Sequence, residues 1–512
     1  MKRNFFQWRT GGEEYLRLSE DIRRGTPTAV FGVSEAHKYY LASLVDAPVL
    51  YIAPDPLAAQ RAAESIRALS GKKVTLLPAK DEVLLYQNAL SKESFFKRMN
   101  ALWEIECGAE VIVSDMDALL QRVPTSLAKI YLKVGEEVDY LSFPSVLTRF
   151  GYTREYEVEA KGSFAVRGDI LDIYPINLSH PVRIDFFGDT IERIKPHDET
   201  TGERLSQIDE IAILGATDCF VTPKDASRIE AELKRGIKAA KSDKAYLRMS
   251  SIADDLLNGI GQGAGNSFLL PLLEGTGTVF DLLQKDTVVL FDECKLVNDR
   301  ADSILKEHFE RFLNLSDGGE VFPFSKDQLI AKEVFGKEID RFRKVALQTF
   351  ASNLYLFKAL KSYDLKATPM GRYVNGFENL ASDLRAWRRN NYRVILFCGN
   401  ASRAEKMHDF LSDLGLSEER PENADLLDTI FVTEENFAHG FILHEAKLVL
   451  IGSEDLYTKS VREKRVKRRR GDVFVAPEIG DYAVHETYGI GKITGTKIIE
   501  TLESTKEYIS IA

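Results

Sequence analysis

Cysteine and histidine are scarce and scattered in this sequence. The four cysteines lie far apart and never form a Cys-x-x-Cys pair. They are Cys107, Cys219, Cys294 and Cys398. This spacing excludes a zinc ribbon and a disulfide framework, and it favours buried or incidental thiols. Because the eight histidines also lack His-x-x-x-His spacing, the sequence predicts no metal site.

Long apolar runs are absent as well. No stretch approaches the length that is needed to cross a bilayer. The first residues, MKRNFFQWRTGGEEY, have a basic start but lack the apolar segment and the cleavage site of a secretory signal. We therefore expect a cytoplasmic protein with no membrane partner.

The charge balance is acidic, with a formal net charge of -10. This excludes a protein that coats nucleic acid over its whole surface, so any DNA contact must be local. One block, between positions 462 and 470, is strongly basic. Such a run favours a flexible solvated linker, but it also suits contacts with a phosphate backbone. The candidates for phosphate contacts are Arg465, Lys467, Arg468, Arg469 and Arg470.

What is present is a repeated strand-then-helix pattern. Short β-rich runs at 28–33, 49–53, 74–78 and 111–114 alternate with helical stretches such as 35–44 and 56–69. This alternation predicts an α/β fold with a parallel sheet and helices on both faces.

The 512 residues exceed what one hydrophobic core usually serves, so we expect several domains. From about Tyr131 the pattern changes to strands punctuated by turns, which predicts an α+β insert. The α/β core resumes with a strand at 287–291 and helices at 226–240 and 301–312. A further α/β unit follows, which we expect to be self-contained, and the final Val/Ile/Tyr alternation has the texture of a small barrel. The predicted boundaries are 1–128, 129–216, 217–375, 376–458, a basic linker at 459–477, and 478–512.

One loop has the position of a nucleotide-binding P-loop. The stretch from Gly32 to Tyr39 follows a strand and opens a helix, and Gly32 and Lys38 match the pattern G-x-x-x-x-G-K-[ST]. However, His37 replaces the second glycine and would crowd the phosphates. Tyr39 replaces the magnesium-binding hydroxyl, and Glu35 adds negative charge where an anion should rest.

Asp292 and Glu293 follow an apolar strand, as the partner acidic motif of such ATPases does. A strand that ends in acidic residues is common, so this motif alone is weak. We interpret Gly32, Lys38, Asp292 and Glu293 as a degenerate nucleotide site without catalytic residues. An active P-loop ATPase or helicase remains the alternative.

The stretches GSFAVRGDILDIYP (162–175) and PVRIDFFGD (181–189) closely resemble domain 2 of UvrB and its counterpart in the transcription-repair coupling factor family. With them, the α/β stretches on either side resemble UvrB domains 1a and 1b. The stretch IGDYAVHETYGIGK (479–492) resembles the start of the RNA-polymerase-interacting domain that coupling factors share with CarD-like regulators. UvrB lacks that domain, so the combination points to the coupling factors.

The resemblance implies a scaffold that recruits UvrA of nucleotide excision repair to stalled RNA polymerase. Carried over by motif, the UvrA-binding candidates are Arg167, Arg183 and Phe187. Phe186 and Phe187 are adjacent on a strand, so one of them must face the core. The candidates for the polymerase β subunit are Ile499, Thr501 and Leu502, at a strand edge that can pair with a partner strand.

The family also implies an ATP-dependent DNA translocase, with ATP, Mg²⁺ and most DNA contacts in motor domains that follow this region. Those motor domains are absent here, and the chain ends within an expected barrel strand, so we expect a truncated product or fragment with no cofactor and no small-molecule substrate. The tyrosine-rich hairpin of UvrB has no counterpart between Tyr86 and Val111, so damage verification is not implied. A CarD-type polymerase-binding regulator is a second alternative.

Overall fold

The computed structural model describes most of the chain, in two units, 1–458 and 459–512. The described residues are 12–86, 92–198, 206–261, 265–373, 377–416, 430–457, 482–485, 489–501 and 504–511. Among these residues, every helix is too short or too polar to cross a membrane.

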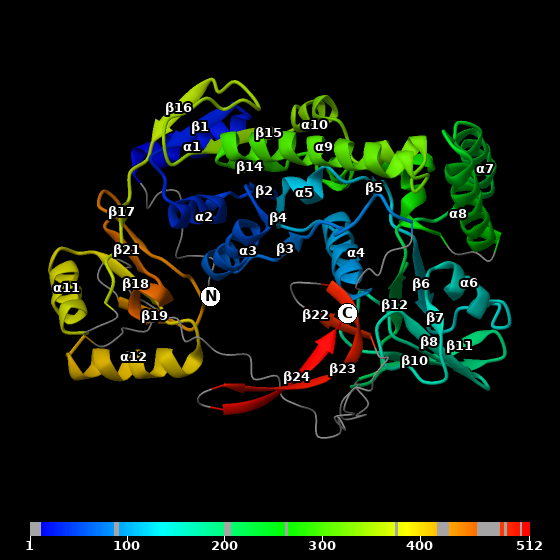
Figure 1. The fold of residues 1–512 in the computed structure, drawn as a ribbon. Helices are drawn as coiled ribbons and strands as arrows, with labels where there is room; N and C mark the ends of the chain where they lie inside the picture. Colours follow the sequence, from blue (N-terminus) through cyan, green and yellow to red (C-terminus); the bar gives the residue numbers. More distant parts are fainter. Residues whose placement is uncertain are drawn as a thin grey trace. The chain divides into compact units, whose positions relative to one another are not determined.

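A seven-stranded parallel sheet forms the centre of the first unit (Figure 1). In spatial order the strands are β16 (Lys361–Asp364), β1 (Thr28–Phe31), β15 (Arg343–Leu347), β14 (Val288–Asp292), β2 (Val49–Ala53), β4 (Val111–Asp115) and β3 (Val74–Leu77). Strands from before and after the insert lie side by side, so the α/β core does resume after it. The predicted parallel sheet is confirmed.

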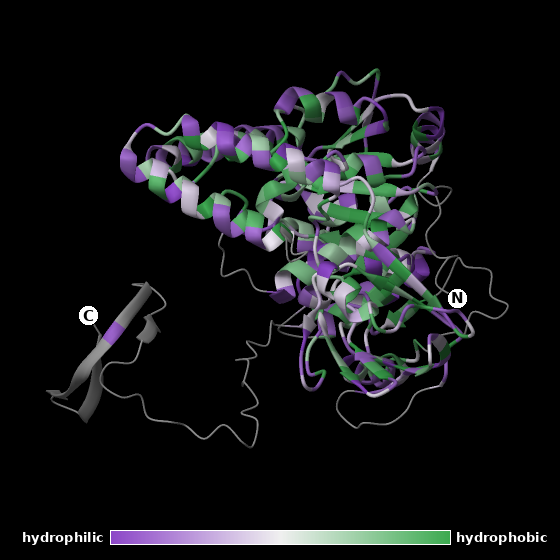
Figure 2. Ribbon diagram, turned by 90° about the vertical axis from the view of Figure 1, so that its right-hand side faces the viewer, coloured by the Kyte–Doolittle hydropathy of each residue, from purple (hydrophilic) through white to green (hydrophobic). Residues whose placement is uncertain are grey.

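Helices cover both faces of this sheet, because successive residues of its strands point to opposite sides. Ala29, Leu50 and Phe291 pack on one face, and their neighbours Val30, Tyr51 and Leu290 pack on the other. The first face is covered by α4 (Lys92–Glu106), α5 (Met116–Leu119), α9 (Cys294–Asp317) and α10 (Lys332–Ile339). The second is covered by α1 (Glu13–Arg24), α2 (Glu35–Leu44) and α3 (Pro56–Ser70). Figure 2 shows apolar residues gathered between these layers.

The insert is built on an antiparallel meander with one parallel edge strand. Its strands, in spatial order, are β11 (Thr190–Pro196), β10 (Val182–Phe187), β9 (Ile170–Ile173), β8 (Ser163–Arg167) and β7 (Thr153–Arg154). A second pair consists of β12 (Glu210–Leu214) and β6 (Lys129–Lys133), and α6 spans Phe143–Arg149. Gly168 and Gly188 have positive φ values of 59° and 57°, as the two tight turns require.

A helical arm follows the insert. It contains α7 (Pro223–Lys238) and α8 (Asp243–Gly261), which pack on each other through residues such as Leu233 and Ile252. Thr222 and Asp225 form a capping box that fixes the start of α7. Short elements then return the chain to the sheet: η3 (Ser267–Leu272), β13 (Thr276–Gly277), which pairs with β5 (Val123–Pro124), and η4 (Val279–Leu282). A further short helix, η5 (Pro323–Gln328), follows α9.

The last part of the first unit is a five-stranded mixed sheet. Its strands, in spatial order, are β17 (Thr368–Pro369), β20 (Phe441–Leu443), β21 (Leu448–Ile451), β18 (Arg393–Phe397) and β19 (Ile430–Thr433). Its helices are α11 (Phe377–Arg389), α12 (Ala401–Asp413) and α13 (Ser453–Leu456). These helices share a core with only one face of the sheet, and the other face belongs to the core of α1, α2 and α3. The expectation of a self-contained unit was therefore wrong.

The second unit contains three antiparallel strands among its described residues. They are β22 (Tyr482–His485), β23 (Gly489–Thr501) and β24 (Ser504–Ile511). The predicted barrel stays a prediction. The predicted linker, 459–477, lies outside the described residues.

Candidate nucleotide-site remnant and partner-binding surface

The lysine of the P-loop-like stretch forms a buried ion pair within the chain. Lys38 lies on α2, and its Nζ is 2.7 Å from Asp292 Oδ1 and 2.5 Å from Glu293 Oε1. Asp292 ends β14, and Glu293 stands at the start of α9 with a φ of 58°, which is uncommon for a residue with a side chain. The structure thus brings together three of the four residues of the predicted degenerate site.

Other side chains complete this ion cluster. The Tyr51 hydroxyl donates to Asp292 Oδ2 at 2.8 Å, and the Thr349 hydroxyl donates to Glu293 Oε1 at 2.6 Å. Burial opposes the charge of Lys38, but the carboxylates of Asp292 and Glu293 together outweigh this effect, and the pKa of Lys38 is raised. The ammonium therefore stays charged, and its attraction is directed at two carboxylates of the same chain.

Carboxylate side chains lie close to the loop that precedes α2. Gly32 has a φ of 76°, and a Cβ at this position would lie only 2.7 Å from Asp364 Oδ1. On the other side of the loop, Glu35 accepts a hydrogen bond of 2.7 Å from the Tyr39 hydroxyl. A phosphate group would meet these carboxylates, which are paired with Lys366 and Arg61, and Lys38 is already engaged by Asp292 and Glu293. We therefore expect this loop to be a poor fit for a nucleoside triphosphate.

The two adjacent phenylalanines of β10 face opposite ways. Phe186 is 4% exposed and packs in the insert core, whereas Phe187 is 75% exposed. The prediction that one of the pair faces the core is confirmed. Phe187 therefore remains available as an apolar contact at the end of the insert sheet.

The two predicted arginines differ in what they already bind. Arg183 makes a bidentate pair with Asp172 on the neighbouring strand, at 2.7 and 2.9 Å. Arg167 ends β8, where its Nη2 donates to the Tyr156 carbonyl at 2.8 Å and to Glu157 Oε1 at 3.0 Å. Its guanidinium also lies 4.8 Å from the centre of the Tyr156 ring. Only Arg167 therefore presents a solvent-facing charge that is not held in a bidentate pair.

Tyr156 was missed by sequence reasoning, although it is 85% exposed. It lies between charged residues in the segment that precedes β8. The local sequence pattern therefore predicts no packing partner for its ring. The pairing of β7 with β8 places it beside Arg167. An exposed aromatic and a cation at one strand end form a typical protein-contact pair.

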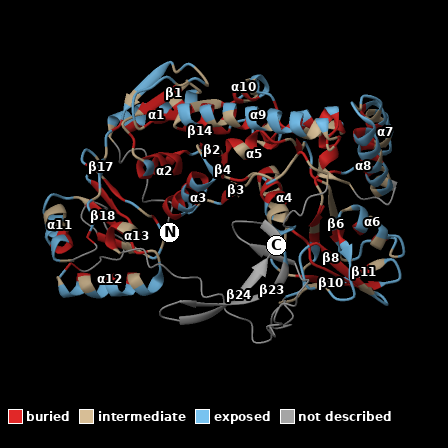
Figure 3. Cartoon of the chain, viewed as in Figure 1, coloured by how far each residue is buried: buried red, intermediate tan, exposed pale blue. Residues whose placement is uncertain are grey.

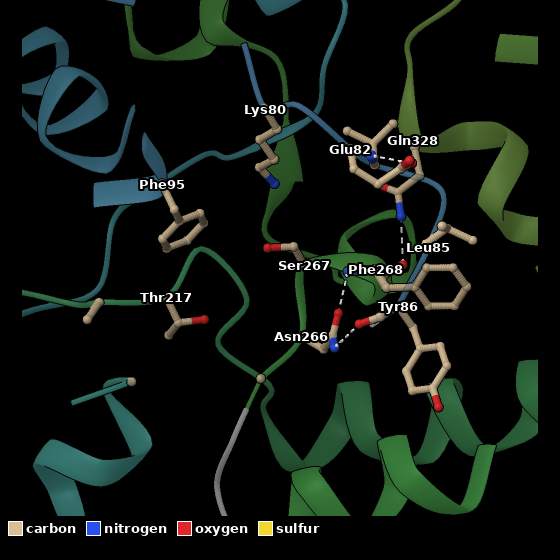
Figure 4. Close-up of a pocket in the computed structure, with 14 residues that line it drawn as sticks. Lys80, Glu82, Leu85, Tyr86, Phe95, Thr217, Asn266, Ser267, Phe268 and Gln328 are labelled. Carbon is tan, nitrogen blue, oxygen red and sulfur yellow. Dashed lines mark hydrogen bonds between the residues drawn. The ribbon is translucent and has the colours of Figure 1, made fainter. Parts of the chain in front are cut away.

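A cavity of about 360 Å³ lies where the central sheet, the insert and the helical arm meet (Figure 4). Its walls include Lys80, Phe95, Thr217, Asn266 and Ser267. Lys80 is buried and forms an ion pair with Asp218, which also accepts a hydrogen bond from Ser267. Burial lowers the pKa of Lys80. Sequence reasoning did not find this cavity, because its wall comes from several separate segments of the chain.

The remaining predicted site residues fall in or near the second unit. Ile499 and Thr501 lie on β23, paired with Lys506 and Ser504 of β24. Leu502 lies outside the described residues, as do the phosphate-contact candidates Arg465, Lys467, Arg468, Arg469 and Arg470. Within the described part of the chain, no cluster of His, Cys, Asp and Glu could hold a metal ion.

Two family models match the chain. The UvrB interaction domain matches residues 130–219, and the CarD-like/TRCF RID domain matches residues 478–512. A solved structure titled XPD helicase aligns with 81% of this chain and 78% of its own, but at 11% identity and a TM-score of 0.23, which is too low to establish a common fold.

Several curated relatives share one name. The transcription-repair-coupling factor of Bacillus subtilis strain 168 is 22% identical over 92% of this chain and 42% of its own length. That of Myxococcus xanthus is 25% identical over 96% of this chain and 44% of its own. The chain thus spans about two-fifths of the length of these relatives. It carries a UvrB interaction domain and a CarD-like/TRCF RID domain, and it is a homologue of the transcription-repair-coupling factors over most of its length.

Proposed function

We propose that this chain is a docking scaffold that brings UvrA of nucleotide excision repair to stalled RNA polymerase. In this proposal the chain itself has no enzymatic activity and no cofactor. ATP-driven translocation on DNA belongs to motor domains of the longer family members. The observation that carries the proposal is the exposed pair of Arg167 and Phe187 within the matched UvrB interaction domain.

The insert offers UvrA a mixed apolar and cationic contact. Phe187 supplies an aromatic anchor, and such residues dominate the binding energy of many interfaces. Arg167 supplies guanidinium donors for a carboxylate or carbonyl of the partner. Arg183 is a third candidate contact, and its guanidinium is held in place by Asp172.

The second unit is the proposed contact for the polymerase β subunit. Its match to the CarD-like/TRCF RID domain supports this assignment. Ile499 and Thr501 lie on the long strand β23, and an extended strand can add a strand of a partner through main-chain hydrogen bonds. The basic run before it is a proposed, secondary contact for DNA phosphates.

An active ATPase is disfavoured by the ion pairs of Lys38 and by the acidic cover of Gly32. A CarD-type regulator would bind polymerase without any affinity for UvrA. Capture of UvrA therefore separates the scaffold from this second alternative.

The test is capture of purified UvrA by the immobilised full chain. The double variant Arg167→Ala/Phe187→Ala should lose capture by about tenfold or more, as expected for hot-spot residues. Arg149→Ala, an exposed arginine on α6, serves as the matched control and should capture normally. Undiminished capture by the double variant would remove the site, and absence of capture by the unmodified chain would remove the proposed function.

A further inference from the structure

Helix α2 lies between two sheets, and α3 packs beside it. One hydrophobic core joins them to the seven-stranded sheet and also to the five-stranded sheet of residues 368–451. Every residue of α2 from Ala36 to Leu44 is buried, and Figure 3 shows this helix almost entirely in the buried colour. A helix that is buried on all sides is a shared layer, whereas a helix that opens onto a ligand keeps its first turn accessible.

The contact between the two sheets includes four aromatic side chains, which we call the inter-sheet joint. They are Tyr15 of α1, His37 and Tyr40 of α2, and Phe441 of β20. The ring centre of Phe441 is 5.2 Å from that of His37 and 5.6 Å from that of Tyr40. His37 Nε2 and the Tyr15 hydroxyl share a hydrogen bond of 2.5 Å. Such separations are those of packed aromatic pairs.

His37 occupies the position of the second P-loop glycine, yet its ring is not in the loop. The side chain is 0% exposed and points into the inter-sheet joint. Burial lowers its pKa to about 3, so the ring is neutral at physiological pH. The neutral ring of His37 has a packing role, and its only described polar partner is Tyr15.

The five-stranded sheet depends on this contact. Its helices α11 and α12 cover the face formed by residues such as Val394 and Leu396. The alternate residues on the same strands, including Ile395, Phe397 and Leu450, belong to the hydrophobic core that contains α2. Without α2 this apolar face of the five-stranded sheet would be exposed to water, which is unfavourable.

We infer that the nucleotide-binding element has been converted into an intramolecular docking socket for the five-stranded sheet, with His37 as its central contact. In open α/β sheets ligands bind beyond the carboxyl ends of the strands. In this chain α2, which starts at that end of β1, instead holds the second sheet. The two sheets are therefore joined permanently, with no requirement for nucleotide or magnesium.

Amide hydrogen exchange on the full chain tests this inference. Phe441→Ala and His37→Ala should each speed exchange in β18, β20 and β21 by roughly tenfold or more, while β2 and β14 stay protected. Phe309→Ala, an exposed phenylalanine on α9, is the matched control and should change neither sheet. Unchanged protection of β18, β20 and β21 in both variants would overturn the inference.

A second variant separates the socket from a surviving ligand site. His37→Gly restores the glycine of the P-loop pattern, and it should loosen the five-stranded sheet as His37→Ala does. Magnesium and ATP should protect neither variant nor the unmodified chain, because Asp364, Asp292 and Glu293 remain in place. Protection of both sheets by magnesium and ATP would contradict a nucleotide-independent joint. If a variant unfolds as a whole, His37→Gln, which keeps polarity and approximate size, must still loosen β20 selectively.

Discussion

The ammonium of Lys38 and the carboxylate of Asp292 form a buried ion pair, with 2.7 Å between Nζ and Oδ1 and 254 positions between the residues. The pair ties α2 to the end of β14. It also satisfies, within the chain, the charge that a P-loop lysine would use on phosphates. The same contact therefore stabilises the core and supports the proposal that the site no longer binds nucleotide.

Removing Lys38 should destabilise the fold, and no loss of nucleotide binding should accompany this change. Lys38→Ala leaves the buried Asp292 and the partly buried Glu293 without their cation, and breaking a buried ion pair in this way costs about 3–5 kcal/mol. Thermal unfolding should show a clear fall in Tm. Lys97→Ala removes an exposed pair with Glu93 and should leave Tm nearly unchanged. Equal stability of the two variants would contradict the structural role of Lys38.

The neighbouring phenylalanines of β10 should give opposite results. Phe186→Ala creates a cavity in the insert core and should lower its unfolding free energy by about 3–5 kcal/mol. Phe187→Ala should leave stability within about 0.5 kcal/mol, since its side chain is exposed, but it should weaken UvrA capture. Chemical unfolding and capture assays on both variants check this. Normal UvrA capture by a stable Phe187→Ala protein would remove Phe187 from the interface.

Acid should loosen the inter-sheet joint through His37. Its pKa is lowered by burial from an ordinary 6.5 to about 3, so the unfolded chain takes up a proton that the folded chain refuses. The contribution of this residue is therefore fully present above pH 6.5 and is lost as the pH falls toward 3, at up to about 1.4 kcal/mol per pH unit. Unfolding free energies at pH 7 and pH 5 should differ less in His37→Gln than in the unmodified chain. An identical pH dependence in His37→Gln and the unmodified chain would contradict the assignment.

Sequence reasoning predicted the central sheet because its strands alternate with helices and are buried on both faces. It also placed Phe186 and Phe187 on opposite sides, which follows from the period of a strand. It did not predict that Arg183 is held by Asp172, because this pair depends on the register between β9 and β10. Register is set by the whole insert core, which no local pattern contains.

The sequence pattern also did not predict that the five-stranded sheet packs on α2. A buried strand such as 393–397 indicates that both faces are covered, but it does not indicate which helices cover them. Helix α9 likewise spans Cys294–Asp317, well beyond the expected 301–312, because its first turns are buried through Val297 and Ala301. The predicted domain boundaries and the roles of Ile499, Thr501 and Leu502 stay predictions.

Thermal unfolding of the full chain with and without a non-hydrolysable ATP analogue and magnesium tests the central claim most directly. If carboxylates of the same chain close the P-loop-like stretch, the protein should show the same Tm in both conditions, since a ligand raises Tm only by binding the folded state. A rise in Tm that disappears in Lys38→Ala would show that the site still binds nucleotide, and it would contradict the account.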